Sequence, residues 1–164
     1  MINNMEMLSD YKQIINKFKQ KLFARFKDDL ISPVLFGSVA RGTARKESDI
    51  DMLIILKDAP ASYYDRLKPV IDIELELRND IEGMQPIFSS IILSQDEAKQ
   101  NRNIFLDMID DSIILYDTND FFKNRLSELK NRLVQLGSKK VILDDSTWYW
   151  NLKPDIEAGE IIEL

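Results

Sequence analysis

One short segment restricts the folds open to this chain more than any other: the apolar run at residues 50–56. It reads Ile-Asp-Met-Leu-Ile-Ile-Leu, and only Asp51 near its start is polar. A strand with one solvated face alternates apolar and polar residues, so an almost unbroken apolar run predicts a strand that is covered on both faces. The chain is therefore expected to place other elements on both sides of a sheet.

The patterns on either side of this strand predict helices that alternate with further short strands. Apolar residues at helical spacing predict a first helix over about 9–27, with Ser9 as its N-cap. Ser94 and Glu97 form a capping box that should open a helix ending near Asp110. The other expected elements are strands at 34–36, 87–93 and 113–116, helices at 62–82 (interrupted early by Pro69) and 119–136 (stopped by Gly137), and a hairpin of 141–143 with 147–152. This order predicts an α/β or α+β domain, with a small mixed sheet flanked by helices.

The last part of the chain differs from the rest in charge and in aromatic content. Residues 1–137 are expected to form one domain, and 138–164 a C-terminal hairpin and acidic tail packed on it. From Asp144 onward there are six acidic residues and one lysine. Their net charge of −5 is nearly all of the net charge of −6 of the chain. Trp148, Tyr149 and Trp150 alternate across the hairpin, so at least one aromatic should face outward. The tail either binds a basic partner or covers the edge of the core.

Composition excludes several kinds of chemistry. The 164 residues include no cysteine and no histidine, which excludes a Cys/His zinc site, a disulfide, a thiol nucleophile and a Ser-His-Asp triad. The acidic balance disfavours direct binding to nucleic acid. The start of the chain lacks a secretory signal, and the apolar runs are far too short to span a membrane. These features predict a cytoplasmic protein with no membrane partner.

The segment before the apolar strand combines three features that suit phosphate chemistry. A predicted strand ends at Gly37-Ser38, where a residue without Cβ lets backbone amides approach an anion. A short linker with Arg41 follows, and then Asp49 and Asp51 stand two residues apart at the head of the strand, on one face. Two such carboxylates suit Mg²⁺, which prefers few protein oxygens together with substrate phosphates. The arrangement indicates in-line nucleotidyl transfer.

Gly37-Ser38, ten residues, then Asp49-x-Asp51 resembles the signature of the polymerase-β-like nucleotidyltransferase superfamily. The tighter form, Gly-Ser-x-Ala-Arg-Gly followed by Ser-Asp-Ile-Asp, is similar to the minimal nucleotidyltransferase (MNT) proteins. The resemblance implies catalytic roles for Ser38, Asp49 and Asp51, with Mg²⁺ on the two aspartates. It implies that Gly37, Ser38 and Arg41 bind a nucleoside triphosphate, ATP. MNT proteins are often paired with a HEPN-domain ribonuclease, and some act as antitoxins by transferring AMP from ATP to a tyrosine of that partner.

One departure from the family pattern leaves two functions open. The superfamily usually takes a third carboxylate from a later strand, but here that strand offers only Ser89 or Ser90, and Glu74 and Glu76 fall on a predicted helix with solvated positions expected for both. The first hypothesis is an enzyme, a Mg²⁺-dependent transferase of AMP to a partner protein, as the antitoxin of an MNT/HEPN pair. The second is a catalytically weak binding module that neutralises a HEPN ribonuclease by docking. The acceptor and the state of homo- or hetero-oligomerisation stay open.

Overall fold

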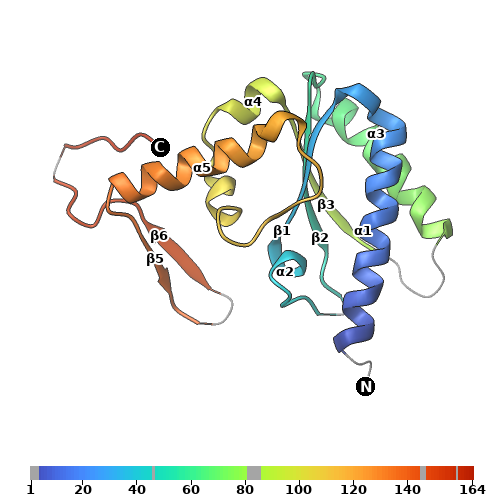
Figure 1. Ribbon diagram of the computed structural model, residues 1–164, viewed down its shortest axis with the longest axis horizontal. Helices are drawn as coiled ribbons and strands as arrows, with labels where there is room; N and C mark the ends of the chain where they lie inside the picture. The colour runs from blue at the N-terminus through green and yellow to red at the C-terminus, as the bar shows by residue number, and fades with distance from the viewer. Residues whose placement is uncertain (1–3, 46, 81–85, 145–146, 158) are drawn as a thin grey trace.

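The structure is a computed structural model that describes residues 4–45, 47–80, 86–144, 147–157 and 159–164, with side chains from Tyr11 onward. Helices and strands alternate through most of the chain (Figure 1). The helices are α1 (Asn4–Phe26), α2 (Gly37–Ala40), α3 (Tyr63–Asp80), α4 (Gln95–Lys99) and α5 (Phe121–Gln135), with 3-10 turns η1 (Lys27–Asp29), η2 (Asn103–Asp107) and η3 (Thr118–Asp120). The strands are β1 (Leu30–Phe36), β2 (Ile50–Leu56), β3 (Phe88–Ser94), β4 (Ile113–Ile114), β5 (Lys139–Ile142) and β6 (Trp148–Asn151).

The central sheet is mixed and has the strand order β3-β2-β1-β4. β1 runs antiparallel to both β2 and β4, whereas β2 and β3 run parallel, as the long crossover through α3 requires. β2 begins at Ile50 and ends at Leu56, as the apolar run predicts, and it lies inside the sheet between β1 and β3. The predicted small mixed sheet is confirmed.

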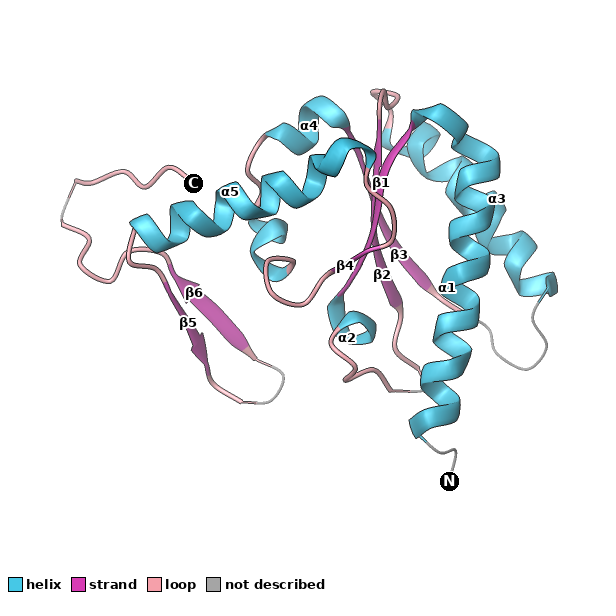
Figure 2. Ribbon diagram, in the orientation of Figure 1, coloured by secondary structure: helices cyan, strands magenta, loops and turns pink. Residues whose placement is uncertain are grey.

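Helices cover both faces of this sheet, which explains why β2 is apolar on both sides (Figure 2). On one face α1 and α3 pack against Ile50, Met52 and Ile54 of β2. On the other face α4, η2 and α5 pack against Leu53 and Ile55. Asp51 has the same parity along β2 as this second pair, so its side chain belongs to the face of η2 and α5.

Three details of the predicted helices need correction. α1 begins at Asn4, so Ser9 lies inside the helix and is not its N-cap. α3 continues through Pro69, its seventh residue, although a proline at this position cannot donate the backbone hydrogen bond to the carbonyl of Asp65. The capping box of Ser94 and Glu97 is present, but α4 ends at Lys99, and η2 rather than a continuous helix follows.

The C-terminal hairpin is confirmed, with Ile142 opposite Trp148 and Lys140 opposite Trp150. Gly137, with φ of 67°, ends α5 as expected. The tail returns towards α5, where Arg132 Nε donates to the carbonyl of Glu163 at 2.9 Å. The division at residue 137 stays a prediction. None of the helices in the described part of the chain is long and apolar enough to cross a membrane.

Candidate active site

The turn after β1 brings Gly37 against the side chain of Asp51. Antiparallel pairing sets Phe36 opposite Asp51, so the residue that follows Phe36 lies beside the start of β2. Gly37 has φ of 70°, and a Cβ on it would lie 1.9 Å from Asp51 Oδ2. No other residue fits here without displacing the carboxylate, so the contact with Asp51 requires a glycine, whereas the predicted approach of an anion stays a prediction.

The surroundings of Asp51 disfavour its charged form. Burial raises the pKa of Asp51, and the negative charge of Asp49 raises it further. The Arg41 guanidinium and a hydrogen bond from the Ser89 hydroxyl act in the opposite direction, but the pKa stays above its usual range. Asp49 itself is exposed and lies just before the first residue of β2. The structure thus brings the two predicted carboxylates close enough to repel each other.

The two serines of the motif have different surroundings. The Ser38 carbonyl accepts hydrogen bonds from the backbone N–H of Thr43 at 3.0 Å and from its hydroxyl at 3.4 Å, which closes the loop after α2. The Ser38 hydroxyl has no hydrogen-bond partner among the residues that the structure describes. In contrast, Ser48 Oγ accepts from the Arg45 N–H at 2.9 Å, so Ser48 is a local cap. Among the described residues, the Ser38 hydroxyl is thus left for a ligand, whereas Ser48 Oγ already accepts a hydrogen bond.

Arg41 follows α2 and connects the turn to the C-terminal hairpin. Its charge acts on Asp51, and its guanidinium carbon lies 4.7 Å from the ring centroid of Trp148 in β6. Lys140 of β5 lies 5.0 Å from the same ring and forms ion pairs with Asp110 and Asp111 at 3.3 and 3.8 Å. Cation–π contacts of this kind hold an arginine in place without neutralising its charge.

The position expected for a third carboxylate is occupied by Ser89. Parallel pairing of β2 and β3 sets Ser89 opposite Asp51, whereas Ser90 is opposite Met52. Glu76 is exposed and forms an ion pair with Lys21, as expected for a solvated position. Glu74 is half-buried, and burial raises the pKa of its carboxyl, so its expected solvated position is not found.

Sequence patterns missed the role of Tyr11. Tyr11 belongs to the apolar residues at helical spacing in α1 and is 2% exposed. Its hydroxyl also reaches the loop before Asp49, where it lies 2.9 Å from the Arg45 carbonyl and 3.1 Å from that of Ser48. Burial and the charge of Asp49 raise the pKa of the Tyr11 phenol. Tyr11 therefore fixes the loop that leads to Asp49. The sequence showed only an aromatic residue in a predicted helix, which does not indicate this contact.

The Asp49–Asp51 pair suits a divalent cation. Two carboxylates that repel each other at the start of β2 are stabilised by a cation between them, and Mg²⁺ needs only one or two protein carboxylates when phosphates complete its shell. Within the described residues there is no group of three or more acidic side chains that could hold a metal alone. The donor set thus suits a metal that arrives with a phosphate ligand.

Comparisons with known proteins agree with this geometry. The nucleotidyltransferase domain family matches residues 15–107, which is more than half of the chain and includes the whole motif. The chain belongs to that family. A Methanocaldococcus jannaschii protein with the name "putative protein adenylyltransferase" is 36% identical over 135 residues, covering 80% of this chain and 88% of that protein. The chain is therefore a nucleotidyltransferase, with a nucleotide as its substrate.

Two solved structures resemble this nucleotidyltransferase at lower identity. A toxin–antitoxin complex with AMP-PNP is 17% identical, with a TM-score of 0.48 over 74% of this chain and 91% of that chain. Tri-AMPylated Shewanella oneidensis HEPN toxin in complex with MNT antitoxin gives 15% identity and a TM-score of 0.47 over 77% and 92%.

Proposed function

We propose that this nucleotidyltransferase transfers AMP from ATP to a hydroxyl of a partner protein, with Mg²⁺, and that it is the antitoxin of an MNT/HEPN pair. The observation that carries the proposal is the close approach of Gly37 to Asp51, with Asp49 adding its charge. This contact places the Gly37-Ser38 turn, which we propose binds phosphate, beside the two carboxylates. The M. jannaschii relative, named for protein adenylylation, supports a protein as the acceptor, and the Gly-Ser-x-Ala-Arg-Gly motif supports a HEPN partner.

In this proposal the turn after β1 binds the triphosphate. The Ser38 hydroxyl donates to a phosphate oxygen, and the first backbone N–H groups of α2, which have no acceptors inside the helix, are available to others. The Arg41 guanidinium neutralises phosphate charge while Trp148 restricts its position. Asp49 and Asp51 hold Mg²⁺, which when bound neutralises the phosphates and aligns them for in-line displacement.

The proposed transfer is a single displacement at the α-phosphorus. The oxygen of the acceptor hydroxyl attacks the α-phosphorus of ATP and forms a new P–O bond. The bond from the α-phosphorus to the oxygen that bridges it to the β-phosphate breaks, and pyrophosphate leaves. The hydroxyl proton passes to water, because Ser89, rather than a carboxylate, faces Asp51 across the strand pair. Stabilisation of charge and orientation, rather than a strong base, accelerates the step.

A matched pair of serine variants tests the phosphate turn. Ser38→Ala should lower the affinity for ATP and Mg²⁺ by about tenfold, since it removes one hydrogen bond to a charged phosphate. Ser48→Ala should leave this affinity unchanged, because Ser48 Oγ is occupied by the Arg45 N–H. Calorimetry with the full chain measures both. Equal affinity of wild type and Ser38→Ala would show that the turn does not bind the triphosphate as proposed.

Acceptor transfer has its own test. The chain, α-labelled ATP and Mg²⁺ are incubated with the protein encoded beside it as the candidate HEPN partner, and label on that protein is the expected result. The position of Ser89 favours a second candidate, a module that neutralises its partner by docking. In that case the partner's ribonuclease activity falls without label transfer, and the double variant Asp49→Ala/Asp51→Ala inhibits it as well as wild type does.

A further inference from the structure

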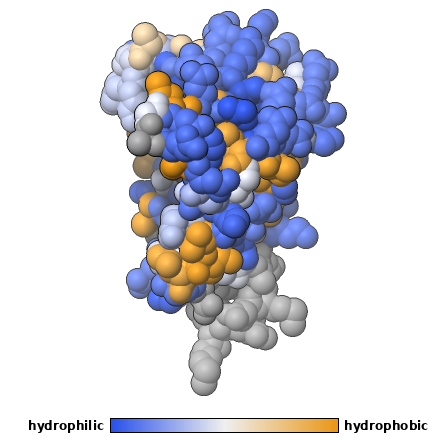
Figure 3. All heavy atoms as spheres, turned by 90° about the vertical axis from the view of Figure 1, so that its left-hand side faces the viewer, coloured by the Kyte–Doolittle hydropathy of each residue, from blue (hydrophilic) through white to orange (hydrophobic). Residues whose placement is uncertain are grey.

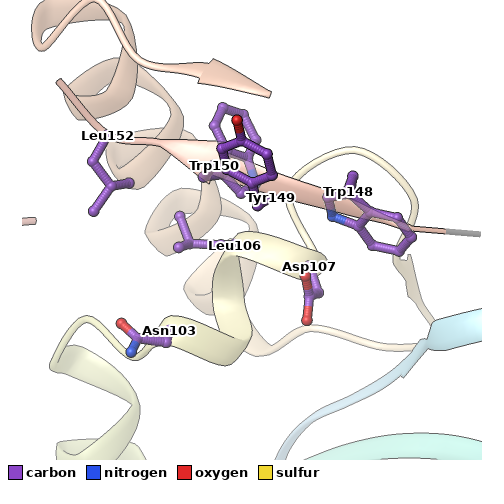
Figure 4. A pocket seen from close by; sticks show the side chains of 7 residues that line it. All are labelled: Asn103, Leu106, Asp107, Trp148, Tyr149, Trp150 and Leu152. Atoms are coloured by element: carbon purple, nitrogen blue, oxygen red, sulfur yellow. The ribbon is translucent and has the colours of Figure 1, made fainter. Parts of the chain in front are cut away.

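A cleft of about 300 Å³ separates η2 from the C-terminal hairpin, beside the nucleotide site (Figure 4). η2 supplies Leu106 and Asp107 to its walls, and β6 with the residue after it supplies Trp148, Tyr149, Trp150 and Leu152. Most of this lining is apolar or aromatic. A cavity of this size accepts one large side chain of a partner or two small ones.

Trp148 belongs both to this cleft and to the proposed nucleotide site. One side chain therefore lines the cleft and contacts Arg41, which in turn acts on Asp51. Asp51 also lies on the face of the sheet that η2 and α5 cover, the same side on which the hairpin is placed (Figure 1). A chain segment held in the cleft could extend past Trp148 and bring a hydroxyl to the α-phosphate.

The polar groups of the cleft walls are not satisfied by the protein itself. Asp107 makes no ion pair with any residue that the structure describes, in contrast to Asp110 and Asp111, which pair with Lys140. The Trp150 indole N–H is buried and has no hydrogen-bond partner among the same residues. A free carboxylate attracts a cation, and an unpaired donor is stabilised by a carbonyl oxygen.

The chain that follows the hairpin turn carries most of the negative charge, although Arg41 and Lys140 contact the Trp148 ring at the cleft wall. Six acidic residues and one lysine follow Leu143 in the sequence, so the hairpin end and tail are negative. Exposed apolar side chains accompany them, among which Ile142 is 71% and Ile161 is 88% exposed. Figure 3 turns this end of the molecule to the viewer and shows apolar areas between hydrophilic ones. Such a surface complements a polypeptide that is both apolar and basic.

We propose that this cleft is the subsite that receives the acceptor polypeptide, binding an apolar or aromatic side chain whose neighbours in the acceptor are basic. The inference rests on the proposed function, since it names the acceptor class for the same reaction. Trp148 then separates the nucleotide from the acceptor and contacts both. A second nucleotide is a poor occupant, because Asp107 would repel its phosphates.

The two tryptophans make the cleft directly observable, since they are the only ones in the chain and both line it. Trp148→Phe leaves Trp150 as the sole reporter, and Trp150→Phe leaves Trp148. The probes are AMP-PNP with Mg²⁺, and a peptide with a central Leu-Tyr-Leu flanked by lysines or, as control, by glutamates. The lysine peptide should change the emission of Trp150 in the Trp148→Phe protein, and the glutamate peptide should not.

Charge variants sharpen the test. Asp107→Lys, made in the Trp148→Phe protein, should weaken lysine-peptide binding about tenfold, and Asp107→Asn should weaken it less. Asp58→Lys, the same change on an exposed residue at the opposite end of β2, should have no effect. An unchanged Trp150 emission, equal binding by Asp107→Lys, or displacement of the lysine peptide by AMP-PNP would each overturn the acceptor subsite.

The same measurements separate this inference from the proposed function. AMP-PNP with Mg²⁺ should change the emission of Trp148 in the Trp150→Phe protein through Arg41, whether or not a peptide is present. If calorimetry finds no nucleotide binding, the proposed function fails whatever the peptides do. If nucleotide binds normally and the lysine peptide does not reach Trp150, the acceptor subsite fails alone.

Discussion

Two carboxylates at opposite ends of the parallel pair β2–β3 have opposite environments. Asp51 lies at the start of β2, where burial and Asp49 raise its pKa. Glu97 lies just beyond the end of β3, where Arg66 Nη1 donates to it at 2.6 Å and the Ser94 N–H at 2.8 Å. These bonds lower the pKa of Glu97 to about 2. Asp51 is left with few favourable partners, whereas the partly exposed Glu97 accepts hydrogen bonds from both a guanidinium and a backbone N–H.

The two environments suit different roles, one in stability and one in ligand binding. Arg66 and Glu97 connect α3 to the start of α4, so their pairing holds two helices on opposite faces of the sheet. Asp51 accepts a hydrogen bond from Ser89 and is acted on by the charge of Arg41, but burial and the charge of Asp49 outweigh both, so an added cation would relieve the remaining repulsion. A carboxylate that is underpaired in the free protein is the group that a ligand can bind, because the ligand supplies the missing charge.

The largest expected effect is loss of transfer at the underpaired end. Asp49→Ala and Asp51→Ala should each reduce label transfer from α-labelled ATP by at least about 10²–10³-fold, as for removal of one group that stabilises developing charge. Thermal stability in metal-free buffer should stay the same or rise, because a repulsive pair disappears. Asp58→Ala is the matched exposed control. Wild-type transfer by the double variant would remove the two aspartates from the site.

Next is a pair of glycine variants that isolates the contact between the turn and Asp51. Gly37→Ala should lower the free energy of unfolding by about 2–4 kcal/mol, because it combines a positive φ with a clash against Asp51. Gly137→Ala has a similar φ of 67° and no atom within 4 Å of its Cβ, so it should cost about 1–2 kcal/mol. Urea unfolding measures both. Equal losses would mean that Asp51 moves aside freely.

A smaller effect is expected at the well-paired end. Glu97→Gln should lower the free energy of unfolding at pH 7 by about 1–2 kcal/mol, a value reduced for the partial exposure of the pair. The folded pKa lies below the unfolded one, so this stabilisation is present above pH 4.5 and is lost as the pH falls towards about 2. Unfolding curves across this range should therefore converge for wild type and variant. Parallel curves would contradict the low pKa.

The smallest effect is expected for ion pairs whose acidic partners are about half exposed. Lys21 contacts Glu76 and Asp80 at 2.9 and 3.1 Å, between α1 and α3. Both acids are about half exposed, so Lys21→Ala should change the free energy of unfolding by less than about 1 kcal/mol. The change should also shrink as salt is added. A loss as large as that of Glu97→Gln would show that pairing alone, without burial, anchors these helices.

Local patterns predicted the bounds of β2 but only the end of β1, which was expected at 34–36 and begins at Leu30. The unbroken apolar run at 50–56 predicted a strand covered on both faces, and the structure covers it on both. The capping box at Ser94 was also correct, because it involves atoms only three residues apart. The same patterns overestimated α4, since the apolar residues of η2 continue a helical spacing while the backbone at Gln100 is extended.

The sequence by itself determined which residues form the candidate site, because Gly37, Ser38, Asp49 and Asp51 are close in the chain and adjoin two predicted strands. Only the tertiary structure decided what surrounds them. Strand register placed Ser89 beside Asp51, helix packing brought Tyr11 to the loop before Asp49, and the hairpin placed Trp148 over Arg41. These contacts join residues that are 34 to 107 positions apart. Local propensity carries no information at that distance, so only the packing of whole elements selects such partners.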